Sequence, residues 1–459
     1  MSSVVGLFRG AFVCALLGGV AVGVAYTLSP TTVWFGLAMA GLFGWAQKGA
    51  SPDERRWILG VLLTSLVLRL AVLAGFFLFG GSRESLPVLI GDEWLIKWRS
   101  LLLMNIAQGH WLAAPDYVHV AEDYGNTGLM NAFAYWQLWF GPAPYGTHLI
   151  NVTLWHAAAI SLYRMTRRGF GPVAAVGGLV LLLFVPTLFV WSVSALKEPI
   201  YFFLTTMAIA GGYLVLRGPG LWRRMAGGVL VVVACAAIWP IRSIALAVVS
   251  GGVMLGMTAW LCTRRGWLAV AAATILVGGV VRAQQTPTVE AWVMKQYRMA
   301  ATTHLGNVQT VGYSYRLLDQ RFYMNWTADP VKTLQPDEAG RFTLRALVSF
   351  FAEPLPWHAE STAAVVFIVQ QVVWYVLAAL MFVGIAAGWR RDSALTSMLV
   401  GNIIVGGVVV ALFNGNVGTF VRFRDSVVTI IVWLSALGGC VAIEWAARRF
   451  FGENLDASS

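Results

Sequence analysis

The chain has 459 residues, of which 58% are hydrophobic and only 12% are charged. A soluble globular protein carries about 25% charged residues, so this composition excludes an ordinary soluble domain. The formal net charge of +11 comes largely from arginine pairs in short loops between apolar runs, which indicates the cytoplasmic side of a membrane rather than a nucleic-acid-binding surface.

The apolar runs of roughly 16–25 residues are long enough to cross a hydrocarbon core about 30 Å thick. We therefore expect an all-α, polytopic transmembrane bundle of about twelve spans. In chain order, the predicted spans are residues 11–28, 32–47, 57–79, 145–163, 172–190, 199–216, 225–240, 241–262, 266–282, 363–388, 395–413 and 425–446. With Arg9 inside, this order places the short basic loops and both termini on the cytoplasmic side.

One of these spans and one shorter apolar segment need a separate interpretation. The first apolar run resembles a signal peptide, but a second span follows it directly, so we expect residues 11–28 to remain as an uncleaved helix. Residues 129–141 are too short to span comfortably and are rich in Trp and Tyr, which predicts an interfacial or re-entrant helix.

The polar residues gather in two longer segments on the predicted outer side. We divide the chain into N-terminal helices at 1–56, a transmembrane module at 57–282, a second outer segment at 283–362 and C-terminal helices at 363–459. The module includes the first outer segment, residues 80–144. Both outer segments are expected to carry interfacial helices, and together they offer enough polar side chains to build a site.

Two adjacent carboxylates, Asp92 and Glu93, lie in the first outer segment shortly after the apolar run 57–79. Neighbouring carboxylates at a membrane surface are costly to keep partly buried unless they bind a cation or move a proton. This placement predicts a catalytic pair. The ordinary alternative is a solvated pair in a loop.

Charged residues beside or within other spans are the next candidates. Lys197 and Glu198 occupy an outer turn between two spans, where they either face the site or mark a helix start at the membrane surface. Arg69 lies well inside a predicted span, so it should face a cavity or a partner rather than lipid. Its partner is either a substrate phosphate, a carboxylate or a structural ion pair.

Arg422 and Arg424 precede the last predicted span. A guanidinium group can form two parallel hydrogen bonds with a phosphate, so these arginines are predicted to bind a lipid phosphate; headgroup snorkelling is the alternative. We expect an extended approach through Gly418 and Thr419, with the helix starting near Asp425.

The second outer segment interleaves aromatic rings with polar donors, including Tyr313 and Tyr315. That mixture is typical of carbohydrate sites, and an interfacial amphipathic helix is the alternative. Three histidines, His110, His119 and His304, are candidates to join Asp92 in a metal site. None of them has the HExxH spacing of a metal-binding motif, so the sequence leaves metal binding open.

The order of further motifs carries a family resemblance. They are Tyr124-Gly125 with Gly128, Leu138-Trp139-Phe140-Gly141, His148-Leu149-Ile150-Asn151, Arg167-Arg168-Gly169-Phe170-Gly171-Pro172 and Ser192–Pro199. With Asp92-Glu93, this order resembles the N-terminal module of the GT-C glycosyltransferases, which include protein O-mannosyltransferases and lipid A aminoarabinose transferases. It resembles more closely the bacterial envelope-polysaccharide members, as do two C-terminal patches, 351–357 and 416–424.

The resemblance implies a sugar donor on a polyprenyl phosphate, in contact with membrane lipids. The sugar would pass with inversion to a glycan, lipid or protein acceptor on the outer face of a bacterial inner membrane. The family's acidic residue carries over to Asp92, as the base that takes the acceptor's proton. Glu93 would orient Asp92, ligate a metal or act itself. No cofactor is implied with certainty, and a divalent cation stays open.

Two other functions remain open from the sequence. An O-antigen-type polymerase or ligase also uses outer-side arginines and lipid-linked glycans. A transporter of lipid-linked sugars would need no catalytic base, but it predicts several charges near the middle of spans, where Arg69 is nearly alone.

Overall fold

The computed structural model describes residues 15, 16, 18–20, 22, 23, 29–79, 92–111, 127–143, 145–268, 270, 271, 273–275, 278, 286–310, 314–324, 329–355 and 362–451. Within these residues every regular element is a helix, apart from one isolated bridge between Ser314 and Asn416. The prediction of an all-α chain is confirmed.

The chain forms two compact units. The first unit contains residues 1–160, 189–204 and 237–243, and the second contains residues 161–188, 205–236 and 244–459. Contacts therefore group the chain differently from the four consecutive segments expected from the sequence. Each unit is described by itself.

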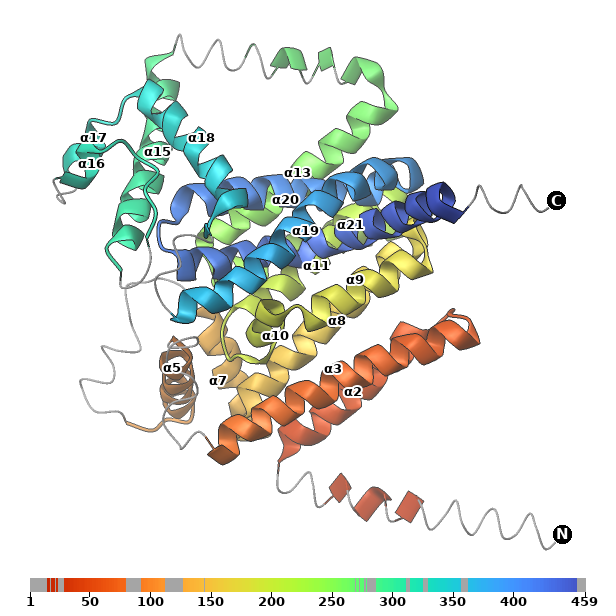
Figure 1. Ribbon diagram of the computed structural model, residues 1–459. Coiled ribbons are helices and arrows are strands. Elements are labelled where there is room, and N and C mark those ends of the chain that lie inside the picture. Colours follow the sequence, from red (N-terminus) through yellow and green to blue (C-terminus); the bar gives the residue numbers. More distant parts are fainter. Residues whose placement is uncertain are drawn as a thin grey trace, which may run out of the picture. The chain divides into compact units, whose positions relative to one another are not determined.

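The first unit is built on a few helices that are close in sequence. They are α2 (Pro30–Gln47), α3 (Pro52–Phe79), α5 (Asp92–Ala107), α7 (Gly128–Phe140), the first part of α8 (Gly146–Phe170), the end of α10 (Pro186–Val193) and the start of α11 (Glu198–Arg217). Figure 1 shows α2 and α3 side by side. Helix α2 begins where Ser29 Oγ accepts a hydrogen bond from the Thr32 amide at 3.4 Å.

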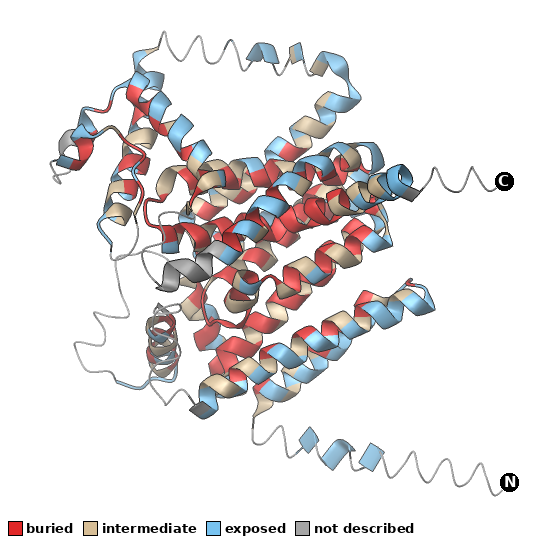
Figure 2. Cartoon of the chain, in the orientation of Figure 1, coloured by how far each residue is buried: buried red, intermediate tan, exposed pale blue. Residues whose placement is uncertain are grey.

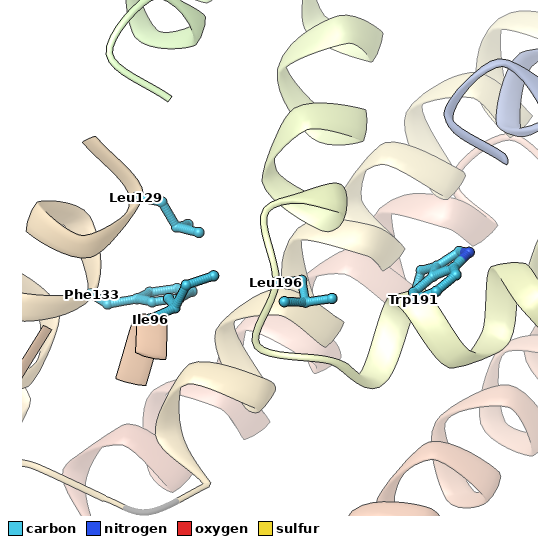
Figure 3. Close-up of a cluster of buried hydrophobic side chains, with 5 residues drawn as sticks. All are labelled: Ile96, Leu129, Phe133, Trp191 and Leu196. Atoms are coloured by element: carbon cyan, nitrogen blue, oxygen red, sulfur yellow. The ribbon is translucent and has the colours of Figure 1, made fainter. Parts of the chain in front are cut away.

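One hydrophobic cluster fixes α5 and α7 against the turn between α10 and α11. Its buried members are Ile96, Leu129, Phe133, Trp191 and Leu196. Figure 3 shows Ile96, Leu129 and Phe133 together, facing Leu196 of the turn. Ile96 is the member that belongs to α5, so its burial in this cluster holds the helix that begins with Asp92 and Glu93.

The second unit holds the remaining helices. They are α9 (Pro172–Phe184), α12 (Leu221–Ile238), α13 (Ser243–Arg264), α15 (Pro287–Val308), α16 (Arg321–Met324), α17 (Asp329–Lys332), α18 (Pro336–Ala352), α19 (Thr362–Arg391), α20 (Ser393–Phe413) and α21 (Val417–Phe451), with the later parts of α8 and α11. Helices α9, α19 and α20 all pack against α21 (Figure 1). Figure 2 shows buried residues along α20 and the adjoining part of α21.

Glycines allow the closest of these crossings. A Cβ atom at Gly384 of α19 would overlap the carbonyl oxygen of Leu434 on α21, and one at Gly438 would overlap the carbonyl oxygen of Leu380. On α9, a Cβ at Gly178 would overlap the Trp433 ring. Small residues let transmembrane helices approach until their backbones touch.

Seven helices of the described residues are long and apolar enough to cross a membrane: Pro52–Leu78, Glu198–Arg217, Leu221–Ile238, Ser243–Arg264, Val369–Arg391, Ser393–Phe413 and Val417–Phe450. The pair α9 and α10 forms an eighth if a 65° bend is allowed, and Pro186 explains that break because proline cannot continue the hydrogen-bond ladder. The chain is thus a multi-pass helical membrane protein.

The other predicted spans have different outcomes. Helices form at 32–47 and 145–163 but fall outside the seven, and α8 carries His148, Asn151 and His156 along its length. The runs 11–28 and 266–282 lie partly outside the described residues. The total of about twelve membrane spans stays a prediction.

The expected start of the last helix was wrong. Helix α21 begins at Val417, eight residues before Asp425. Asn416 explains the earlier start, because its Oδ1 accepts hydrogen bonds from the amides of Gly418 at 2.9 Å and Thr419 at 3.4 Å. This cap satisfies amides that an extended approach would leave free.

Candidate functional site

The best-defined polar cluster of the first unit surrounds Glu93, whose side chain is buried in the first turn of α5. Its Oε1 lies 3.0 Å from His148 Nε2 and 3.3 Å from Lys97 Nζ. Its Oε2 accepts a hydrogen bond from the Ala195 amide at 3.2 Å. A buried carboxylate needs such partners, because an uncompensated charge in a low-dielectric interior is costly.

These partners keep Glu93 ionised. Burial raises the pKa of the Glu93 carboxyl, but the hydrogen bond and charge of His148, the charge of Lys97 and the Ala195 amide together outweigh burial. The pKa therefore lies below its usual value. A carboxylate stabilised in this way is a weak proton acceptor and a strong electrostatic anchor.

Hydrogen bonds fix the orientation of the His148 ring. Its Nδ1 donates to the Val193 carbonyl oxygen at 2.8 Å, because a carbonyl oxygen can only accept. Its Nε2 faces the Glu93 carboxylate and lies 3.4 Å from Lys97 Nζ. His148 and Lys97 therefore share one carboxylate.

The same face of α8 holds the turn between α10 and α11. Asn151 Nδ2 donates to the carbonyl oxygens of Ser194 at 2.7 Å and Leu196 at 2.8 Å. His148 and Asn151 are three residues apart, so they lie on one face of the helix. Together with Glu93, they tie residues 193–196 to α5 and α8.

The predicted pair Lys197 and Glu198 follows this turn and lies in the same compact unit as Glu93. Lys197 is half-buried at the end of the turn, and Glu198 is buried where α11 begins. Lys197 thus ends the turn between two helices, and Glu198 has the helix-start position that was the alternative for the pair. Asp92 is the first residue of α5, directly before Glu93, and its side chain lies outside the described residues.

Arg69 supports the same region from α3. It is fully buried, its Nε donates to Ser192 Oγ at 2.7 Å, and its Nη1 donates to the Ser65 carbonyl at 3.2 Å. The guanidinium also lies 4.6 Å from the centre of the Phe189 ring. Arg69 therefore anchors the end of α10, as expected for an intramembrane arginine that avoids lipid.

The other predicted arginines belong to the second unit. Arg424 is buried, with Nη1 donating to the Glu353 carbonyl at 2.7 Å and Nη2 to Gln371 Oε1 at 2.9 Å. Its guanidinium also packs against the rings of Trp374 and Phe420. Because the segment is helical, the half-buried Arg422 points roughly 200° away from Arg424. The two do not share one face.

Tyr315 also lies inside the second unit, with its ring 5.5 Å from that of Phe420. Burial raises the pKa of the Tyr315 phenol, and the charge of Glu353 adds to this rise. Tyr313 lies outside the described residues. Tyr315 therefore has a packed environment rather than an open sugar-binding face.

Of the histidines proposed for a metal site, the two that the structure describes, His304 and His110, have separate environments. His304 Nδ1 donates to the Asn414 carbonyl at 2.7 Å, and Nε2 lies 2.8 Å from the Tyr323 hydroxyl. His110 is exposed, and His119 lies outside the described residues. Among the described residues, no three His, Cys, Asp or Glu side chains form a cluster for a metal ion.

Three residues that contact Glu93 or the turn beside it were not predicted as site residues. Lys97 follows Glu93 by four residues, a spacing that signals an ion pair on a helix. His148 and Asn151 lie within a motif that carries the family resemblance, and their spacing of three was the available signal. A spacing of three shows that the two side chains share one face of a helix, but it does not show which residues that face contacts.

Comparisons with protein-family models, with curated proteins and with solved structures found no match for this chain.

Proposed function

We propose that this protein is an integral membrane glycosyltransferase that moves a sugar from a polyprenyl-phosphate donor to a glycan, lipid or protein acceptor, with inversion. The observation that carries this proposal is the buried Glu93, which joins the Asp92-Glu93 pair to the turn before Lys197 and Glu198. The resemblance to GT-C transferases supports the same function. The proposal includes about twelve spans, cytoplasmic termini and a site on the outer face of a bacterial inner membrane.

The two carboxylates take different roles. Glu93 is ionised and is held by three partners, namely Lys97, His148 and the Ala195 amide, so it positions the start of α5. Asp92 is then the base: its carboxylate takes the proton of the acceptor hydroxyl as that oxygen attacks the anomeric carbon. The bond from the anomeric carbon to the phosphate oxygen breaks, and the phosphate leaves with the electron pair.

The leaving phosphate needs positive charge, because a polyprenyl phosphate departs as an anion. In the first unit, Lys97 supplies positive charge beside Glu93, and Lys197 follows the turn that Asn151 and Glu93 hold. We assign charge stabilisation to this group, ahead of Arg424, whose guanidinium binds protein carbonyls. A divalent cation beside Asp92 stays open, and chelation followed by addition of Mg²⁺ or Mn²⁺ tests it.

Asp92→Asn tests the catalytic assignment. In proteoliposomes supplied with radiolabelled undecaprenyl-phosphate-linked mannose, glucose or arabinose, we expect release of undecaprenyl phosphate to fall about 10²–10⁴-fold. Asp53→Asn is the matched control, because Asp53 is an exposed aspartate in the first turn of α3. It should retain wild-type turnover.

Retention of more than about a tenth of the turnover by Asp92→Asn would contradict its role as a base that contributes the usual 10²–10⁴-fold. If Arg422→Lys instead abolished turnover, an O-antigen-type polymerase or ligase would replace the proposed function. If no lipid-linked sugar reacted with the wild-type protein, the transporter would be the next function to test.

A further inference from the structure

A group of arginines at one end of the second unit has no role in the proposed transfer. Three of them, Arg164, Arg167 and Arg168, lie in the last two turns of α8. Residues three and four positions apart share one face of a helix, so these three cations are neighbours. Burial lowers the pKa of Arg164, and the charges of Arg168 and Arg167 lower it further. These side chains therefore repel one another.

Other helix ends meet at this place. Arg217, at the end of α11, lies 3.5 Å from Asp392 Oδ1, and Tyr213 donates to Asp392 Oδ2 at 2.8 Å. Arg391, the last residue of α19, donates to the Phe170 carbonyl at the end of α8, at 2.7 Å. The ends of α8, α11 and α19 and the start of α20 thus form one surface, here called the arginine end.

The carboxylate at the centre of the arginine end is already satisfied. Asp392 Oδ1 accepts from the amides of Ala394 and Leu395, both at 3.1 Å, as the cap of α20. Arg217 and Tyr213 complete its surroundings. Its negative charge is therefore shared among a helix start, Arg217 and Tyr213.

Exposed positive charge gathers on this surface. Asp392 is buried and serves as the cap of α20. Arg168, Arg217, Arg390 and Arg391 are exposed. An anion at this surface would offset part of their positive charge.

The position of the surface indicates which anion binds. Two membrane-crossing helices end at Arg217 and Arg391, and a third begins at Ser393. Contact between Arg217 and Asp392 brings these ends to the same boundary. The boundary of an apolar span lies at the depth of the lipid headgroups.

We propose that the arginine end is a binding site for an anionic phospholipid, whose headgroup phosphates contact Arg168, Arg217 and Arg390. Guanidinium groups bind phosphate through paired charge-assisted hydrogen bonds, and basic pockets at helix ends suit headgroups that carry one or two phosphates. All three residues belong to the second unit, and the proposed transfer assigns them no role.

Lipid binding to the purified protein in detergent tests the site. The probes are cardiolipin and dioleoyl phosphatidylglycerol, with dioleoyl phosphatidylcholine and inorganic phosphate as comparisons, and native mass spectrometry measures the bound fraction. Arg168→Gln with Arg217→Gln should weaken binding of the two anionic lipids about 10- to 30-fold. Arg168→Gln with Arg390→Gln should do the same while it leaves the Arg217–Asp392 ion pair intact.

The control removes two positive charges from another part of the protein. Arg448→Gln with Arg449→Gln changes two exposed arginines at the end of α21 and should bind lipid as the wild type does. Equal losses in all three double variants would overturn the proposal in favour of diffuse surface attraction. Equal binding of phosphatidylcholine, or competition by millimolar inorganic phosphate, would also overturn it.

Discussion

Glu93 has the surroundings of an electrostatic anchor. It is buried among His148, Lys97 and the Ala195 amide. A carboxylate held by such partners is a weak proton acceptor. Our proposal therefore assigns the base to Asp92, the residue with which α5 begins.

His304 provides a pH test at the residue scale. Burial lowers its pKa to about 4, although its hydrogen bond to Asn414 acts in the opposite direction. Above about pH 6.5 the ring is neutral in both the folded and unfolded chain. Between about pH 6.5 and pH 4 the unfolded chain binds the proton first, so the free energy of unfolding should fall, by about 3 kcal/mol in total.

Thermal unfolding in detergent from pH 7.5 to pH 4 measures this loss. His304→Gln should be less stable at pH 7.5 and should show a shallower decline with pH. The exposed His110 gives the control, since His110→Gln should keep the wild-type decline. Identical slopes for wild type and His304→Gln would assign the acid sensitivity to other groups.

At the scale of elements, the turn between α10 and α11 is held from α8. Asn151→Ala would remove the hydrogen bonds to the Ser194 and Leu196 carbonyls. Leaving these buried carbonyls without a donor should cost about 1–3 kcal/mol each at most. We expect a lower unfolding temperature and a larger fall in turnover than in the Michaelis constant, because the turn leads into Lys197 and Glu198.

Thr153→Ala is the matched control for the turn. Thr153 also lies on α8, but its hydroxyl donates only to Leu149 of the same helix, at 2.8 Å. It should leave turnover unchanged. If both variants behaved alike, general stability of α8 rather than the turn would explain the effect of Asn151.

The crossing of α19 and α21 gives a second test at this scale. Gly384→Ala would place a methyl group against the Leu434 carbonyl and force the helices apart. Overpacking of this kind costs about 1–3 kcal/mol, so the unfolding temperature should fall. Gly228→Ala on α12 meets no atom within 4 Å and should be neutral or stabilising, because alanine favours a helix over glycine. A neutral Gly384→Ala would show that the crossing can relax.

At the scale of the whole molecule, the decisive expectation is the side of the membrane on which each loop lies. We expect Thr310→Cys, after α15, to react with an impermeant thiol reagent in intact cells, and Pro219→Cys, beside Arg217, to react only after permeabilisation. The background is the chain with Cys14, Cys235, Cys262 and Cys440 replaced by serine or alanine. Labelling of Thr310→Cys only after permeabilisation would invert the topology and remove the proposed outer-face site.

The sequence by itself determined that this is a multi-pass helical membrane protein. Apolar runs of span length must form helices, because a bilayer offers no other partner for backbone amides and carbonyls. The break at Pro240 and the turn before Glu198 were also predictable, since proline and charge interrupt apolar helices locally. These features depend only on neighbours along the chain.

Only the tertiary structure decided which charges meet. Glu93 contacts His148 across 55 residues of sequence, and Arg424 faces the Glu353 carbonyl rather than the membrane surface. Helix α21 starts early because Asn416 caps it, which an apolar pattern does not reveal. Such contacts depend on how helices cross, and the crossing depends on the packing of side chains that are distant in sequence.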